Sequence, residues 1–97
     1  MRTYTNLSEA NLNEAKLTGA TLRQSDLSEA NLSDAKLKWA DLSKVNAEAA
    51  NLSEADLTKA MLKETNLTGA NLTNANLNKA DLSEVVMPDT TLDNSKN

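Results

Sequence analysis

The charged side chains are the residues of this sequence whose types could do chemistry. The chain of 97 residues has 14 Asp and Glu against 10 Lys and Arg, which gives a net charge of −4 and a calculated pI of about 4.7. It contains no Cys and no His. This composition removes disulfides, thiolate chemistry and the side chain that most often serves as general base and metal ligand.

The remaining carboxylates do not by themselves predict an enzyme. General acid–base catalysis needs a pair of titratable groups in a concave, partly dry site that shifts their pKa values. The sequence has no phosphate-binding glycine loop, no nucleophile elbow and no metal-ligand spacing. We therefore expect no enzymatic activity, no catalytic or metal residues and no cofactor.

A repeat of five residues must position the charges. From Thr5 to Leu92 each unit reads as a small residue, usually Asn or Asp, a central Leu, and then a first and a second polar position. Only the small and central positions are consistently apolar, so we expect them to form the core. The eighteen centres are Leu7, Leu12, Leu17, Leu22, Leu27, Leu32, Leu37, Leu42, Ala47, Leu52, Leu57, Leu62, Leu67, Leu72, Leu77, Leu82, Met87 and Leu92.

Neither a helix nor a straight strand accommodates this period. In a helix, a spacing of five would scatter the leucines around the whole cylinder. In a strand, the apolar side would reverse at each unit because five is odd. The chain must therefore turn between units and wind into a solenoid whose coils pair at the usual strand spacing of about 4.8 Å.

The exceptions to the repeat indicate how many units make one coil. Residues other than Ala recur at the small position of every fourth unit, as Thr5, Ser25, Val45, Thr65 and Val85, and a column of Asn follows the same interval at Asn11, Asn31, Asn51 and Asn71. A coil of four units stacks both sets in columns. We expect the stacked asparagines to hydrogen-bond along the solenoid axis, and Gly19 and Gly69 to occupy turns that need positive φ.

One irregular unit predicts compensation in the core. Ala47 replaces a central Leu, and Val45 replaces the small Ala of the same unit. The interior loses volume at one position and regains most of it at the other, as close-packed cores require. Ala47→Leu alone should therefore overpack its layer.

The motif A-(D/N)-L-x-x, as in "ANLSEADLTKA" and "ANLTNANL", resembles the pentapeptide-repeat family. The resemblance implies an all-β fold, a right-handed, four-sided parallel β-helix with about 20 residues per coil and, from eighteen units, about four and a half coils. We expect residues 1–4 to be a lead-in, 5–94 the β-helix and 95–97 a frayed tail.

Sorting the polar positions by face separates the charges. We name four faces by their first centres, Leu7, Leu12, Leu17 and Leu22, each continued at every fourth unit. The Leu7 and Leu12 faces carry carboxylates without any Lys or Arg, the Leu17 face carries five lysines against Asp56, and the Leu22 face is mixed. The acidic candidates for binding a partner are Glu9, Glu14, Asp26, Glu29, Asp34, Glu48 and Glu54. The same charges also fit a solvated surface that discourages lateral association.

The single Trp of the chain lies on the basic side. Trp39 falls at an outward corner, in one column with Gly19 and Lys59, and could anchor a partner because Trp is enriched in binding hot spots. It could equally cover the stems of neighbouring lysines. The basic and aromatic candidates are Lys36, Lys38, Trp39 and Lys59.

The function that follows is a non-catalytic structural scaffold or protein-interaction module with an unidentified protein partner. The family resemblance implies an alternative, because some members mimic acidic B-form DNA and occupy the DNA site of type II topoisomerases such as DNA gyrase. We expect no direct binding of nucleic acid, no membrane segment and a cytoplasmic location. The chain should be a monomer or a weak end-to-end homodimer formed through Val85, Val86 and Met87.

Overall fold

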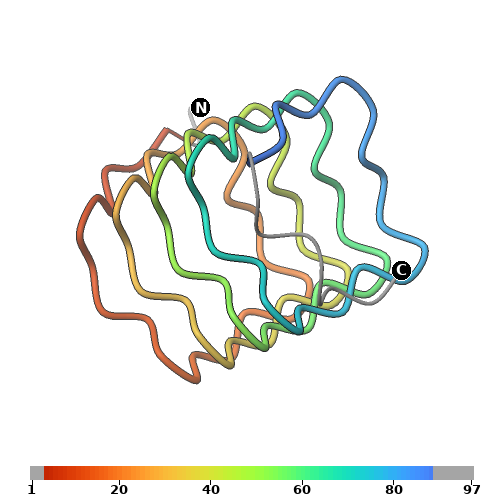
Figure 1. The fold of residues 1–97 in the computed structure, drawn as a ribbon, viewed down its shortest axis with the longest axis horizontal. Coiled ribbons are helices and arrows are strands. Elements are labelled where there is room, and N and C mark those ends of the chain that lie inside the picture. Colours follow the sequence, from red (N-terminus) through yellow and green to blue (C-terminus); the bar gives the residue numbers. More distant parts are fainter. Residues whose placement is uncertain (1–3, 89–97) are drawn as a thin grey trace.

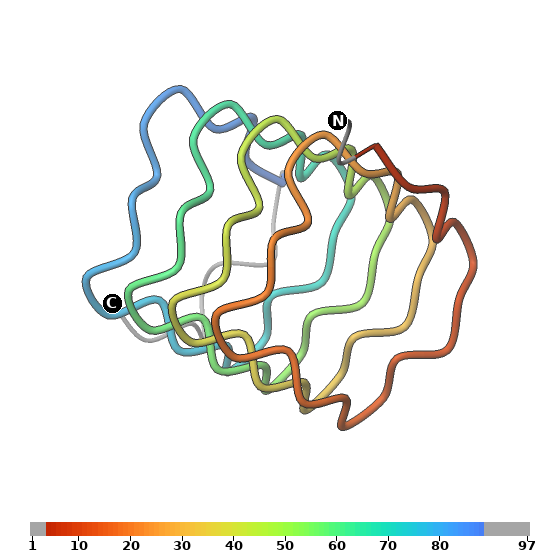
Figure 2. The same cartoon turned by 180° about the vertical axis from the view of Figure 1, so that it is seen from behind.

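Parallel backbone bridges between residues four units apart organise the whole of the described chain. The structure is a computed structural model that describes residues 4–88. Thirteen isolated bridges occur in this range, from Asn6↔Asp26 to Asn66↔Val86. The chain therefore completes one coil in every four units, and successive coils lie side by side from the N-terminal to the C-terminal end (Figures 1 and 2). The predicted lead-in, apart from Tyr4, and the predicted tail lie outside the described residues.

The coils are joined by backbone hydrogen bonds rather than by extended strands. Residues 4–88 contain no helix, and their β-pairing is limited to single-residue bridges. The amide of Leu32 donates to the carbonyl of Asn51 at 2.7 Å, and the amide of Asn51 donates to the carbonyl of Ala30 at 2.9 Å. A third bond joins Asp34 N to Ser53 O at 2.9 Å. On the other side of the same unit, the amide of Asn31 donates to the carbonyl of Ala10 at 2.9 Å. Each such bond contributes about 1 kcal/mol net, so an interior unit is held by both neighbouring coils.

Each unit ends in a tight turn that runs from its central residue to the small residue of the next unit. The carbonyl of Leu32 accepts from the amide of Ala35 at 3.0 Å, and the second polar residue between them, Asp34, has φ 59°. A positive φ at the third residue is the mark of a type II turn. All second polar positions from Glu9 to Glu84 share this conformation.

Glycine occupies only two of these turns. Gly19 and Gly69 have φ of 72° and 69°, as expected, but fourteen non-glycine residues also have positive φ. The left-handed conformation costs an L-residue about 1 kcal/mol. The inter-coil hydrogen bonds offset that cost, because the amide of the strained residue itself donates to the next coil, as in Glu54 N to Thr73 O at 2.9 Å.

The Asn and Asp residues before the centres stabilise the turns from the outside. The Oδ1 atoms of Asn11, Asn31, Asn51 and Asn71 each accept a hydrogen bond from the backbone amide two residues later, at 3.0–3.1 Å. The expectation of hydrogen bonds along the solenoid axis was wrong for this column. The local bond prevails because the side chain is short enough to reach the turn amide that the backbone leaves free.

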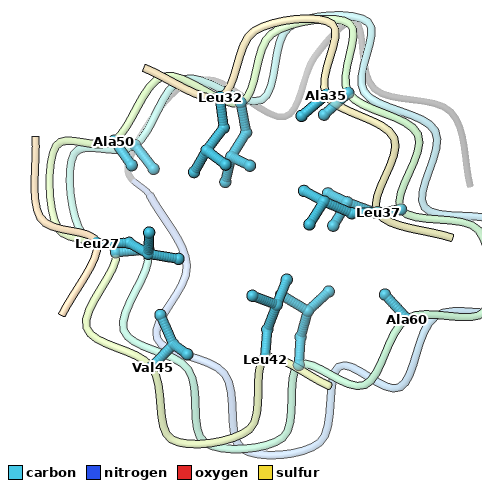
Figure 3. Close-up of a cluster of buried hydrophobic side chains, with 14 of the residues drawn as sticks. Leu27, Leu32, Ala35, Leu37, Leu42, Val45, Ala50 and Ala60 are labelled. Carbon is cyan, nitrogen blue, oxygen red and sulfur yellow. The ribbon is translucent and has the colours of Figure 1, made fainter. Parts of the chain in front are cut away.

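The interior is filled by the central and small residues. Figure 3 shows Leu27, Leu32, Leu37 and Leu42 pointing inward from one coil. The centres from Leu22 to Leu77 are at most 9% exposed, including Ala47 at 3%. Buried polar groups are paired, since no buried side-chain N or O in the described residues lacks a hydrogen bond.

The centres near the two ends are less covered. Leu7, Leu12, Leu17 and Leu82 are half-buried and pack against the core. Met87, expected to be a core centre, is instead 37% exposed because it follows the last bridge, at Val86, and no described coil covers it. The last expected centre, Leu92, lies outside the described residues.

The layer around Ala47 and Val45 is nearly full. Both residues are buried, and the interior space beside them amounts to about 10 Å³. That is about the smallest space that can hold one water molecule. Its lining consists of Leu27, Leu32, Leu37, Leu42, Val45, Ala47, Leu52, Leu62, Thr65 and Leu67.

Ala47→Leu should lower the free energy of unfolding by about 1–3 kcal/mol, because the three added carbon atoms exceed the space available. Urea unfolding of the variant measures this loss. Adding Val45→Ala should recover most of the stability, since the pair then has the arrangement of the regular units. Ala47→Leu as stable as the parent would show that Val45 does not compensate for Ala47.

Asn31→Ala should destabilise the protein by about 1 kcal/mol, because it removes the acceptor for two hydrogen bonds. The amide and the hydroxyl of Ser33 share that acceptor, at 3.0 and 2.7 Å. Asn31→Asp is the matched control because it keeps the acceptor atom. Urea unfolding should place the Asp variant close to the parent, and equal losses in the two variants would contradict the local role of the side chain.

Candidate functional site

The register between successive coils brings carboxylates of like charge together on two adjacent corners. Glu14, Asp34 and Glu54 stack at the second polar position of the Leu12 face, and Glu9 and Glu29 stack at that of the Leu7 face. Neighbouring coils place these residues about 4.8 Å apart along the axis. Like charges directly opposite each other destabilise a sheet, so the two acidic corners are a feature that folding alone does not favour.

The other two acidic candidates lie in different columns. Asp26 stands before its centre and is half-buried, and its Oδ1 accepts from the Ser28 amide at 3.0 Å and the Ser28 hydroxyl at 2.7 Å. Glu48 is exposed at the first polar position. The structure therefore gathers five of the seven acidic candidates on the two acidic corners, and it gives Asp26 a role in its turn.

Hydrogen bonding within the turns lowers the pKa of three aspartates. The Ser28 hydroxyl lowers the pKa of Asp26, and the Ser83 hydroxyl does the same for Asp81. The Thr58 hydroxyl is the main cause for Asp56, whose pKa is also lowered by the positive charges of Lys38 and Lys36. These carboxylates are held in the ionised form as turn acceptors, and a general acid would need the opposite shift.

Trp39 is an exposed aromatic side chain on the basic Leu17 face. Its side chain is 56% exposed, although it stands at a turn with φ 66°. The Lys59 ammonium lies over the indole ring, 4.8 Å from its centroid, which is a favourable cation–π distance. Lys36 and Lys38 are exposed on the same face. The expected column of Trp39 and Lys59 thus makes a direct contact.

A hollow between the acidic and basic sides was not identified from the sequence. It is a depression largely open to solvent and is lined by Glu54, Ala55, Asp56, Asn74 and Asn76. The sequence signal that could have located it is the pair Asn74 and Asn76, whose short amide side chains lie one coil after Glu54 and Asp56. The described residues contain no cluster of three or more His, Cys, Asp or Glu side chains that could hold a metal ion, here or elsewhere.

The sequence itself matches the family model of pentapeptide repeats, with eight copies over residues 5–43 and 50–89. No curated protein matches the chain in sequence. Within the described part of the chain there is also no helix with the length and apolar character needed to span a bilayer. The expectations on partners and on a cytoplasmic location stay predictions.

Solved structures of the same repeat are similar to this chain. A pentapeptide repeat protein from the thylakoid lumen of Arabidopsis thaliana is 34% identical with a TM-score of 0.84, over 90% of this chain and 60% of that one. HetL, a pentapeptide repeat protein involved in heterocyst differentiation regulation in the cyanobacterium Nostoc sp. strain PCC 7120, is 42% identical with a TM-score of 0.58, over 82% and 36%. The chain therefore spans at most 60% of the length of these two proteins.

A more distant structure has the same fold. QnrB1, a plasmid-mediated fluoroquinolone resistance protein, is 19% identical with a TM-score of 0.52, over 88% of this chain and 60% of that one. At this identity the likeness concerns the fold alone.

The triple variant Asp26→Asn, Asp56→Asn and Asp81→Asn should lose less stability in acid than the parent does. A carboxylate whose pKa is lowered on folding stabilises the protein above its unfolded pKa of about 3.9, and that stability is lost as the pH falls through the folded pKa. Asn keeps the acceptor oxygen and does not titrate. Urea unfolding from pH 7 to pH 2 should show the gap between parent and variant shrinking below about pH 4, whereas a constant gap would contradict the shift.

Proposed function

Because the chain belongs to the pentapeptide-repeat family, we propose that it is a non-catalytic protein-interaction module that recognises a protein partner through its outer side-chain columns. The observation that carries this proposal is the separation of charge by column. Glu9, Glu29, Glu14, Asp34 and Glu54 occupy two adjacent corners, while Lys36, Lys38, Lys59 and Lys79 lie on the face beside them.

A solid interior supports the assignment of function to the exterior. Between Leu22 and Leu77 the centres fill the axis, and the space among them is about 10 Å³, too small for a substrate. The outer positions, in contrast, form a regular grid because each backbone position is fixed to the next coil. Rigid positions let a partner be selected by the pattern of charge, with little ordering cost on binding.

We also propose the finer features of the fold as the family implies them, namely a right-handed, four-sided β-helix of about four and a half coils. The parallel bridges between residues four units apart support four units per coil. The exposure of Val86 and Met87, at 52% and 37%, supports a weak end-to-end homodimer as one oligomeric form. A light-scattering dilution series measures that association.

Two charge variants test the interaction proposal. The acidic-corner variant carries Glu9→Gln, Glu14→Gln, Glu29→Gln, Asp34→Asn and Glu54→Gln, and the basic-face variant carries Lys36→Gln, Lys38→Gln and Lys79→Gln. Affinity capture from cells of the source organism, with each variant beside the parent, should yield a partner protein that one variant loses and the other retains. Identical capture profiles for all three proteins would contradict recognition by charge columns.

The acidic corners favour one alternative function, the mimicry of DNA in a type II topoisomerase. In this alternative the purified chain inhibits DNA gyrase supercoiling, and the acidic-corner variant does not inhibit it. Our main proposal predicts no inhibition by either protein at concentrations well above that of the enzyme. Inhibition by the parent that the acidic-corner variant loses would replace the main proposal with the alternative.

A further inference from the structure

Trp39 is an unusual residue for its backbone position. A bulky side chain at positive φ is strained, and such residues are often found where function requires them. Trp39 has φ 66° and is 56% exposed, so core packing does not explain its presence. Other corners of the solenoid are made by small or flexible residues such as Gly69 and Lys44. The indole is therefore the feature of the surface that most needs an explanation.

The two faces of the indole have different surroundings. Lys59, one coil further along the column, places its ammonium 4.8 Å from the ring centroid. One coil before Trp39 the column holds Gly19, and a Cβ built there would meet no atom within 4 Å. The ring face opposite Lys59 is thus directed toward a position without a side chain. We call this open space over the backbone of Gly19, next to the exposed indole one coil further along the column, the slot.

The charges around this slot are positive. Lys16 and Lys36 are joined by a parallel bridge beside it, and Lys38 adjoins Trp39 in the sequence; all three are exposed. The only carboxylate of this face, Asp56, accepts bonds from the Thr58 amide and hydroxyl at 3.1 and 2.6 Å. The lysines of this face therefore outnumber its carboxylate, Asp56, and the excess positive charge lies beside an exposed aromatic side chain.

We propose that this slot binds an acidic segment of the partner protein, with a flat apolar side chain of that segment inserted between Trp39 and the backbone of Gly19. This inference rests on the proposed interaction function and names its site and the chemistry of its partner. The indole supplies stacking area, and the lysines pair with carboxylates that flank the inserted side chain. Lys59 holds the ring from behind, so the site is ordered before the partner arrives.

The rest of the surface favours a protein segment over a nucleic acid. The chain has a net charge of −4, and the two acidic corners carry five carboxylates close to the basic face. An extended polyanion would meet these corners as it followed the surface. A short acidic segment confined to the Leu17 face would avoid them.

The single Trp provides the measurement. Trp39 is the only Trp of the chain, so its fluorescence reports on the slot alone. The probe is a short synthetic peptide in which one Phe is flanked by glutamates, and the comparison peptide has Ala in place of that Phe. Titration with the Phe peptide should change the indole emission saturably, with a Kd roughly two- to tenfold lower than that of the Ala peptide. Added salt should weaken the binding of both peptides.

Gly19→Gln is the variant that closes the slot, and Gly69→Gln is its matched control. Both glycines have positive φ and stand in the same local sequence, "LTGA", but Gly69 lies on the Leu7 face. Gln24 already adopts φ 64° at an equivalent position, so the fold accepts this side chain there. Thermal unfolding verifies that both variants are folded. Gly19→Gln should abolish the advantage of the Phe peptide, and Gly69→Gln should leave it unchanged.

The proposal is overturned if the Phe and Ala peptides bind equally, or if Gly19→Gln binds the Phe peptide as the parent does. Tighter binding of a single-stranded oligothymidylate would assign the slot to nucleic acid instead. An emission change on concentrating the protein without peptide, together with a doubled mass in light scattering, would assign it to a second copy of the chain. Failure of these titrations leaves the capture experiment on the charge variants unaffected, so the slot and the interaction function are tested separately.

Discussion

The backbone hydrogen bond between one coil and the next, repeated around every coil, is the constraint on which the whole structure depends. It fixes the interior, because Leu32 and Leu52 must lie one above the other when Leu32 N donates to Asn51 O at 2.7 Å. It also fixes the exterior, since the same register stacks Glu14 on Asp34. The core contributes apolar burial, but the hydrogen bonds decide which side chains become neighbours. Both the stability and the surface pattern follow from that single register.

The register has a local cost that the sequence offsets with polar side chains. Every described corner has a residue at positive φ, and most of these residues have a Cβ that disfavours it. Where Asn or Asp stands before a centre, its side chain reduces the cost by accepting a hydrogen bond from the free amide of the turn, as Asn51 does from Ser53 at 3.0 Å. The preference for Asn and Asp at this position is therefore structural. Most residues at the two polar positions after the centre are at least partly exposed, and our proposed function assigns recognition to them.

This division explains what could be predicted from the sequence. The period of five and the recurrence at every fourth unit could be predicted because Leu, Ala and Asn recur at fixed intervals. The interval of four units also places Gly19, Trp39 and Lys59 in one column. The positive φ of the non-glycine corner residues could not be predicted, because Glu and Lys do not prefer positive φ and adopt it only under tertiary constraint. The prediction of an axial hydrogen bond from Asn31 was wrong because the nearby Ser33 amide and hydroxyl donate to its Oδ1 instead. The exposure of Met87 could not be predicted, because the repeat does not indicate after which unit the pairing between coils stops.

The acidic corners and the Trp39 column exist only if residues 20 apart pair between successive coils. This pairing is therefore the most direct property to test. The chain has no Cys, which allows paired cysteines to report on proximity. Ser33→Cys combined with Ser53→Cys joins residues one coil apart, whereas Ser33→Cys combined with Glu48→Cys joins residues three units apart. Oxidation at low protein concentration, followed by mass analysis of the monomer, measures disulfide formation. A coil of four units predicts an intramolecular disulfide in the first pair and none in the second. A disulfide in the second pair, or equal rates in both, would contradict that register.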